Sequence, residues 1–285
     1  MAIKEMQGAT PTTTLEGVRL SPRTTRIWLW LTAPIAVLLA IAAGSGLFVE
    51  GLYRDPPSLV AQATGQDVVT LMVALPALVI GAILASRGSE GGRLLWLGAL
   101  GYAVYTYLTY AFGIRFNPMF LVYVALLGCS LYALFGGLAT TNVQAVKTRF
   151  TERTPVKAAS IFLAVVAILF YFVWLSEAVP AVLAGAVPQS VVEDETPTNV
   201  VHVVDMAWIL PGMLLTAVWL WRKRAIGYVL AGALLTFLTL LVLAIVAMAV
   251  VEMSPYGAAG FGILSALSLG MLVWYLRGLK EKKKR

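Results

Sequence analysis

The amino-acid sequence predicts an all-α, polytopic membrane protein with eight transmembrane helices. Its 285 residues are 60% hydrophobic and only 12% charged, whereas soluble proteins carry about 25% charged residues. The mean hydropathy is +0.85. Eight apolar segments are long enough to cross about 30 Å of hydrocarbon at about 1.5 Å per residue. The expected spans are 27–48, 68–86, 94–114, 118–137, 158–177, 203–221, 226–250 and 257–276.

The basic residues predict the orientation of these spans. With the N-terminus inside, only Arg54 and Arg115 of the 21 Lys and Arg residues lie outside, which is a strong positive-inside signal. We therefore expect a protein of the cytoplasmic membrane with both termini in the cytoplasm. The net charge of +7 then faces anionic lipid of the inner leaflet, so no nucleic-acid partner is expected.

The domain organisation follows from the same segments. Residues 1–26 are polar and lack the apolar core of a signal peptide, so we expect a cytoplasmic tail. Two four-helix halves are expected at 27–137 and 158–277, joined by a cytoplasmic linker at 138–157. Residues 278–285 form a basic tail. The lone Cys129 excludes an intrachain disulfide.

An internal repeat is indicated by matching prolines. Pro76 and Pro211 each follow a leucine and each precede a cytoplasmic arginine by eleven residues, and Gly-Ala-Leu recurs at 98–100 and 232–234. This pattern predicts a parallel 4+4 repeat that pairs Asp67 with Asp205. Proline lacks an amide hydrogen and its ring crowds the preceding turn, so both helices should be irregular there. The apolar but interrupted stretches 55–66 and 178–188 are expected to lie at the outer interface.

A polar layer near the outer ends of the spans is the candidate site. His202, the only histidine, and Asp205 lie about 30 Å and about 25 Å from Arg222, at the end opposite that arginine. Asn199, His202 and Asp205 are spaced by three residues and share a helix face. A carboxylate near the hydrocarbon edge requires a partner or a cavity. The ligand-binding candidates are Asp205, His202, Asn199, Glu177, Glu50, Asp67, Arg54, Arg115, Glu252 and Tyr105.

Several chemistries can be excluded or set aside. A retinal protein needs a lysine in mid-span, and every lysine is on the cytoplasmic side. Haem held by two histidines needs a second histidine. His202, Asp205 and Glu177 or Glu252 lack a metal-binding spacing such as HExxH, so no metal site is predicted. A serine hydrolase built on Ser45 and His202 is disfavoured by its sequence context.

The sequence therefore predicts an outward-facing polar pocket that binds or modifies a lipophilic or small-molecule ligand. Two alternatives remain: a small-molecule or ion transporter, and a structural or assembly subunit without its own chemistry. Transporters usually place their polar groups near the midplane, whereas this layer is displaced outward. In a purely structural role, His202 and Asp205 would only hold helices together through hydrogen bonds. Enzymatic activity, cofactors and oligomeric state are left open.

Overall fold

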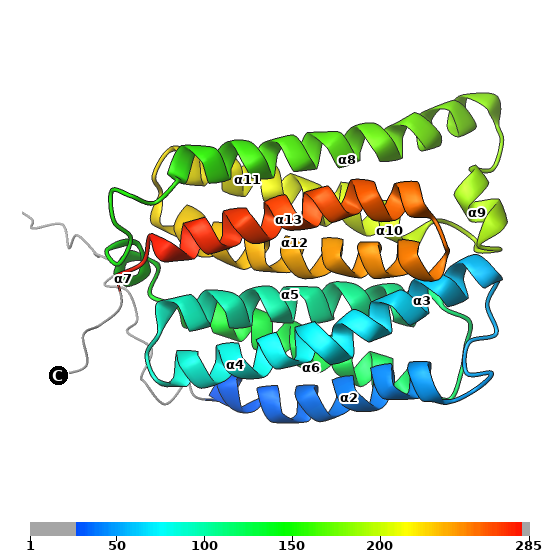
Figure 1. Ribbon diagram of the computed structural model, residues 1–285, viewed down its shortest axis with the longest axis horizontal. Coiled ribbons are helices and arrows are strands. Elements are labelled where there is room, and N and C mark those ends of the chain that lie inside the picture. Colours follow the sequence, from blue (N-terminus) through cyan, green and yellow to red (C-terminus); the bar gives the residue numbers. More distant parts are fainter. Residues whose placement is uncertain (1–26, 281–285) are drawn as a thin grey trace, which may run out of the picture.

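The computed structural model describes residues 27–280, and within this range the regular elements are all helices (Figure 1). The expected N-terminal tail and the end of the basic tail, 281–285, lie outside the described residues. The longer helices are α2 (Thr32–Phe48), α3 (Pro57–Val69), α4 (Leu75–Ser86), α5 (Glu90–Gly113), α6 (Phe120–Ala139), α8 (Val156–Ala184), α11 (Leu210–Trp221), α12 (Ala225–Val251) and α13 (Pro255–Arg277). The short ones are α7 (Val143–Lys147), α9 (Gln189–Glu193) and α10 (Val200–Val204), with π-helical turns η1 (Thr70–Ala74) and η2 (Asp205–Ile209).

Seven helices of the described chain are long and apolar enough to cross a membrane. They are Ile27–Phe48, Pro57–Ser86, Phe120–Ala139, Val156–Ala184, Val200–Trp221, Ala225–Val251 and Pro255–Arg277. The prediction of an all-α, polytopic membrane protein is thus confirmed. Helix α5 is not among the seven, although its 24 residues run alongside the others (Figure 1).

The helices form one elongated bundle in which the two halves lie side by side. Helices α2 to α6 lie along its lower side in Figure 1, and α8 and α11 to α13 along its upper side. In the first half α4 packs on α5, and α5 on α6; in the second half α11 packs on α12, and α12 on α13. Helices α5 and α12 pack against each other at the centre, and both carry many buried residues.

The α5–α12 contact depends on two glycines. A Cβ atom added at Gly98 of α5 would meet the side chain of Thr236 and the carbonyl of Ala233 in α12. One added at Gly232 of α12 would meet Leu94 of α5. The missing side chains let the two backbones approach closely, as small residues commonly do between membrane helices.

The two stretches expected as separate interfacial segments are helical instead. Pro57 occupies the first turn of α3, where proline needs no hydrogen-bond partner, and the helix runs on to Ser86. Helix α8 likewise continues through 178–184, includes Pro180, and ends at Gly185 with φ 62°. Backbone groups left unpaired in hydrocarbon are costly, which favours continuous helices over interrupted ones.

Both Leu-Pro helices contain a π-helical turn immediately before the Leu-Pro pair. The amide of Leu75 donates to the carbonyl of Thr70, and that of Leu210 to the carbonyl of Asp205, five residues back in each case. A wider turn makes room for a proline ring that would clash in a regular α-helix. The helical irregularity predicted at Pro76 and Pro211 is therefore confirmed.

Candidate functional site

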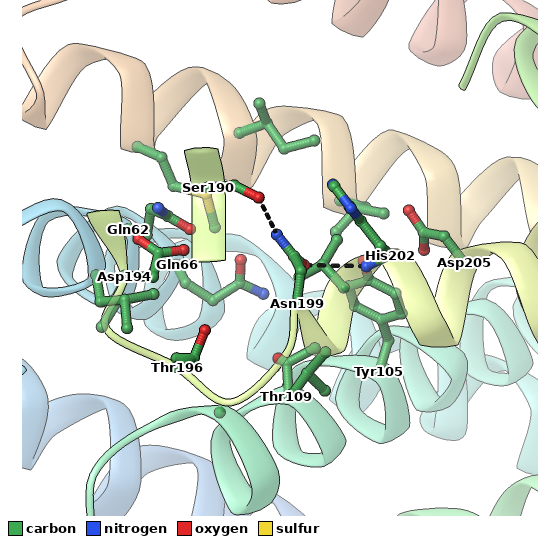
Figure 2. A pocket seen from close by; sticks show the side chains of 18 of the residues that line it. Gln62, Gln66, Tyr105, Thr109, Ser190, Asp194, Thr196, Asn199, His202 and Asp205 are labelled. Atoms are coloured by element: carbon green, nitrogen blue, oxygen red, sulfur yellow. Dashed lines mark hydrogen bonds between the residues drawn. The ribbon is translucent and has the colours of Figure 1, made fainter. Parts of the chain in front are cut away.

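A cavity of about 480 Å³ lies between the two halves, at the end of the bundle that carries α9. Residues of α3, α5, α8, α10, α12 and α13 line it. Six of the predicted candidates line this cavity: Asn199, His202, Asp205, Glu177, Glu252 and Tyr105. Figure 2 shows polar side chains from different helices and loops gathered around it.

Asn199 sets the start of the helix that carries the central residues. It is the N-cap of α10, and its side-chain oxygen accepts a hydrogen bond from the His202 amide at 3.1 Å. Its side-chain nitrogen donates to the Ser190 hydroxyl at 3.2 Å, which ties α10 to α9 (Figure 2). Asparagine is a favoured N-cap because it satisfies an otherwise unpaired amide. Asn199 therefore orients His202 and Asp205 as well as lining the cavity.

His202 is held between an aromatic ring and a carboxylate. Its ring packs on the Trp174 indole with 4.3 Å between centroids. Its Nε2 atom lies 3.7 Å from Oε2 of Glu177, and Oε1 of Glu177 accepts a hydrogen bond from the Ser190 amide at 2.8 Å. The histidine thus links α10 to α8, and Glu177 links α8 to α9.

Asp205 is the deepest carboxylate of the cavity wall. The residue is only 6% exposed, and its Oδ2 atom accepts a hydrogen bond from the Trp174 indole nitrogen at 2.9 Å. The Tyr105 hydroxyl lies close to this carboxylate, but among the described residues no donor makes a hydrogen bond of good geometry to the buried Oδ1 atom. An unpaired buried acceptor costs about 1–3 kcal/mol, and more when it is charged. Asp205 can therefore accept a hydrogen bond or an ion pair from a bound molecule.

The rim of the cavity carries two more carboxylates, Asp194 and Glu252, both outside the apolar spans. Burial raises the pKa of Asp194, which also lies near Glu193 and Glu177, whereas a hydrogen bond from the Ser58 hydroxyl at 2.9 Å opposes that rise. Burial and the neighbouring Asp194 raise the pKa of Glu252. The carboxylates of the rim therefore lie close enough together to disfavour one another's negative charge.

The remaining walls are apolar and aromatic. They include Phe170 of α8, Leu241, Ile245 and Met248 of α12, and Phe261 of α13. Tyr105 of α5 also lines the cavity, and its ring packs edge-on against Phe237 at 5.6 Å. Such a mixture of apolar walls and a few polar groups is typical of small-molecule sites.

The other four candidates lie away from the cavity. Arg115 donates to Oε2 of Glu195 at 2.6 Å and to the carbonyl of Arg54 at 2.8 Å, while its amide donates to Asp55. It therefore fastens the loops at this end of the bundle together and does not neutralise the cavity acids. Arg54 and Glu50 are exposed.

Asp67 lies in a different environment from Asp205. It is completely buried and accepts hydrogen bonds from the hydroxyls of Tyr53 at 2.5 Å and Tyr110 at 3.1 Å. Tyr110 lines the cavity, whereas Asp67 does not. The structure therefore does not bring Glu50, Asp67, Arg54 or Arg115 to the cavity wall that holds Asp205, because spacing along a helix does not fix position around the bundle.

Sequence reasoning missed two important contributors. Trp174, which contacts both His202 and Asp205, lies three residues before Glu177 on α8, and that helical spacing could have indicated it. Asp194 lies at the end of α9 in a polar loop, and no sequence signal distinguishes it from its acidic neighbours.

Neither a metal-binding cluster among the described residues nor a known relative points to a function for this cavity. Within 27–280, no group of three or more His, Cys, Asp or Glu side chains is arranged to hold a metal ion. No protein-family model, curated protein or solved structure matches the chain.

Proposed function

We propose that the protein is an integral membrane protein whose cavity faces the outside of the cell and binds a small amphiphilic cation. The observation that carries the proposal is the charge of the cavity. Four carboxylate residues line it, Glu177, Asp194, Asp205 and Glu252, while none of its described lining residues is lysine or arginine. A cationic ligand would offset this charge, and Oδ1 of Asp205 offers it an acceptor.

The aromatic walls favour an organic cation over a small inorganic ion. Trp174, Tyr105 and Phe261 line the cavity, and aromatic faces attract ammonium groups by about 0.5–2 kcal/mol. The volume of about 480 Å³ lies within the range of about 300–1,000 Å³ that is usual for small-molecule sites. The ligand would place its charged group near Asp205 and its apolar body against α12.

Binding of two cationic probes tests this proposal. Purified protein should bind tetraphenylphosphonium and dodecyltrimethylammonium saturably in equilibrium dialysis. Asp205→Asn should weaken binding by about tenfold or more, equivalent to about 1.4 kcal/mol. Glu50→Gln is the matched control because Glu50 is an exposed carboxylate outside the cavity. Unchanged binding by a folded Asp205→Asn variant, or no saturable binding of either probe, would contradict the proposal.

Transport is the second candidate function, and the paired irregular helices favour it. Interrupted helices at membrane depth commonly line transport sites, where they let one part of a bundle move against another. Here Asp205 lies in η2 itself and lines the cavity. Protein-dependent uptake of tetraphenylphosphonium into proteoliposomes would favour a carrier over a binding protein. A structural subunit without a ligand would neither bind nor move the probes.

We also propose eight spans in the cytoplasmic membrane, with both termini inside and the cavity outside. Helix α5 would be the eighth span, because it is as long as its neighbours and packs between α4, α6 and α12. Its tyrosines and threonines lower its hydropathy, yet Tyr102, Thr106 and Tyr107 are fully buried within the bundle. The distribution of Lys and Arg supports the orientation.

The parallel 4+4 repeat is part of the same proposal. Each π turn has five residues and is followed by a helix of twelve residues. The copies lie 135 residues apart, as Pro76 and Pro211 do. In this register Asp67 corresponds to His202 and Thr70 to Asp205, which replaces the expected pairing of Asp67 with Asp205.

The turns that follow these helices support the same register. Gly88 and Lys223 both adopt positive φ, 84° and 53°. After each turn, a glycine of the next helix packs against the helix before the turn. A Cβ atom at Gly92 of α5 would meet Leu84 of α4, and one at Gly227 of α12 would meet Leu220 of α11. Corresponding helices therefore make corresponding contacts in the two halves.

A further inference from the structure

Asp67 is surrounded by tyrosines and separated from the cavity by one of them. Its carboxylate accepts hydrogen bonds from Tyr53, in the loop after α2, and from Tyr110 of α5. The ring of Tyr110 packs against those of Tyr107 and Tyr123 at 5.6 and 5.3 Å between centroids. Helix α2 contributes Gly46, where any Cβ atom would overlap with the Asp67 carboxylate. The carboxylate itself is completely buried.

No positive group faces Asp67 among the described residues. The titratable groups near it are all tyrosines: Tyr53 of the loop, Tyr102, Tyr107 and Tyr110 of α5, and Tyr123 of α6. Asp55, in the loop after α2, is a charged group near Tyr123. Helix α12, which packs on α3, meets Gly65 with the backbone of Met248. None of the ion pairs between described residues includes Asp67.

An isolated buried carboxylate is much less costly when it carries a proton. Moving an ion from water into a protein interior costs several kcal/mol unless a counter-charge is present. The two phenols supply hydrogen bonds but no charge. The two hydroxyls connect Asp67 to different surroundings. Tyr53 is half-buried at the outer loop, and Tyr110 lines the cavity. Asp67 can thus exchange a proton with outside water and respond to what occupies the cavity.

We propose that Asp67, with Tyr53 and Tyr110, is a proton-binding site coupled to the cavity, so that a bound cation displaces its proton. This rests on the proposed function. A cation beyond Tyr110 would stabilise ionised Asp67 through a medium of low dielectric constant. The O–H bond of the carboxyl breaks and the proton leaves to outside water through Tyr53. One positive charge enters and one leaves, so the exchange is electroneutral. By linkage, protonation of Asp67 weakens cation binding to the same degree.

The first test needs no ligand. Infrared difference spectra recorded across a pH titration should contain the carbonyl stretch of a protonated carboxyl that disappears in Asp67→Asn. Tyr53→Phe should keep this band but shift its frequency, because one hydrogen bond to the carboxyl is lost. Tyr53 lies outside the helices, so this variant serves if Asp67→Asn does not fold. Asp205→Asn should leave the band in place. Spectra unchanged by both Asp67→Asn and Tyr53→Phe would overturn the proton site.

The second test follows protons during binding. Adding tetraphenylphosphonium to weakly buffered protein should release about one proton per bound cation, detected with a pH dye. At pH values where the Asp67 band is present, wild-type affinity should rise about tenfold per pH unit. Asp67→Asn should still bind but lose this release and this slope, whereas Glu50→Gln, at an exposed carboxylate outside the cavity, should keep both.

The two tests separate the proton site from the proposed function. Cation binding without the infrared band would overturn the proton site alone. The band without cation binding would overturn the proposed function and, with it, the coupling. Equal proton release in Asp67→Asn and wild type, or affinity that follows sodium concentration in place of pH, would overturn the coupling.

Discussion

Two carboxylates at the cavity rim should make stability depend on pH. Asp194 and Glu252 have raised pKa values in the folded protein, chiefly because burial disfavours their charged forms. The folded state therefore binds their protons more tightly than the unfolded state. The resulting stabilisation is complete below their ordinary pKa values of 3.8 and 4.5, and it is lost as the pH rises through the raised values.

Glu252→Gln should accordingly raise the melting temperature slightly at neutral pH, because it removes a charge that is only partly desolvated at this exposed position. The gain over wild type should shrink as the pH falls towards 4.5. Melting curves in detergent between pH 4 and 8 measure this, with Glu50→Gln, outside the cavity, as the control. A gain that stays constant over the whole range would show that Glu252 acts through packing and not through charge.

At the scale of the helices, the close crossing of α5 and α12 determines how tightly the halves meet. Gly98→Ala places a methyl group where Thr236 and the Ala233 carbonyl already lie. Overpacking of this kind costs roughly 1–3 kcal/mol. The variant should melt at a lower temperature than wild type, while Gly128→Ala should not, because a Cβ atom at Gly128 meets nothing within 4 Å. Equal melting of the two variants would mean that the helices separate easily at this crossing.

The helices were predictable from sequence because hydrophobic length and turn residues are local properties. The start of α3 was not predicted, since Gln66 and Asp67 look too polar for a span. Both are satisfied by distant partners on α5: Gln66 donates to the Thr106 hydroxyl at 2.6 Å, and Tyr110 donates to Asp67. Such contacts between helices cannot be read from one segment.

The sequence predicted the position of the candidate residues along their helices, but not the side of the bundle that each residue faces. Counting residues from Arg222 placed His202 and Asp205 near one end of their span, and the structure brings both to one cavity with Glu177. The predicted repeat paired Asp67 with Asp205, although Asp67 does not line the cavity and contacts Tyr110, which does. Rotation of each helix about its axis depends on packing, which depth along a helix does not specify.

At the scale of the whole molecule, the proposed topology places α9 outside and the turn after α11 inside. Single cysteines at Gln189 and Lys223, both exposed, test it in a Cys129→Ser background. An impermeant thiol reagent applied to intact cells should label position 189 only, and lysis should make position 223 reactive. Labelling of 223 in intact cells would reverse the orientation and place the cavity in the cytoplasm.

The π turns also bear on which changes in chain length the protein tolerates. A turn closed five residues back contains one residue more than an α-helical turn, so removing one residue there can restore a regular helix without rotating the flanking segments. Removing one residue elsewhere rotates everything on one side by about 100°. Deletion of exposed Met72, within η1, should therefore leave the bundle assembled but less stable, because the Pro76 ring then crowds a regular turn at a cost of about 3 kcal/mol. Deletion of exposed Ile80, in α4, should turn Asp67 away from its tyrosines and prevent assembly. Size-exclusion profiles of the two deletion variants would distinguish them. Through these turns the membrane helices could gain or lose a residue over evolution while keeping the faces that form the cavity.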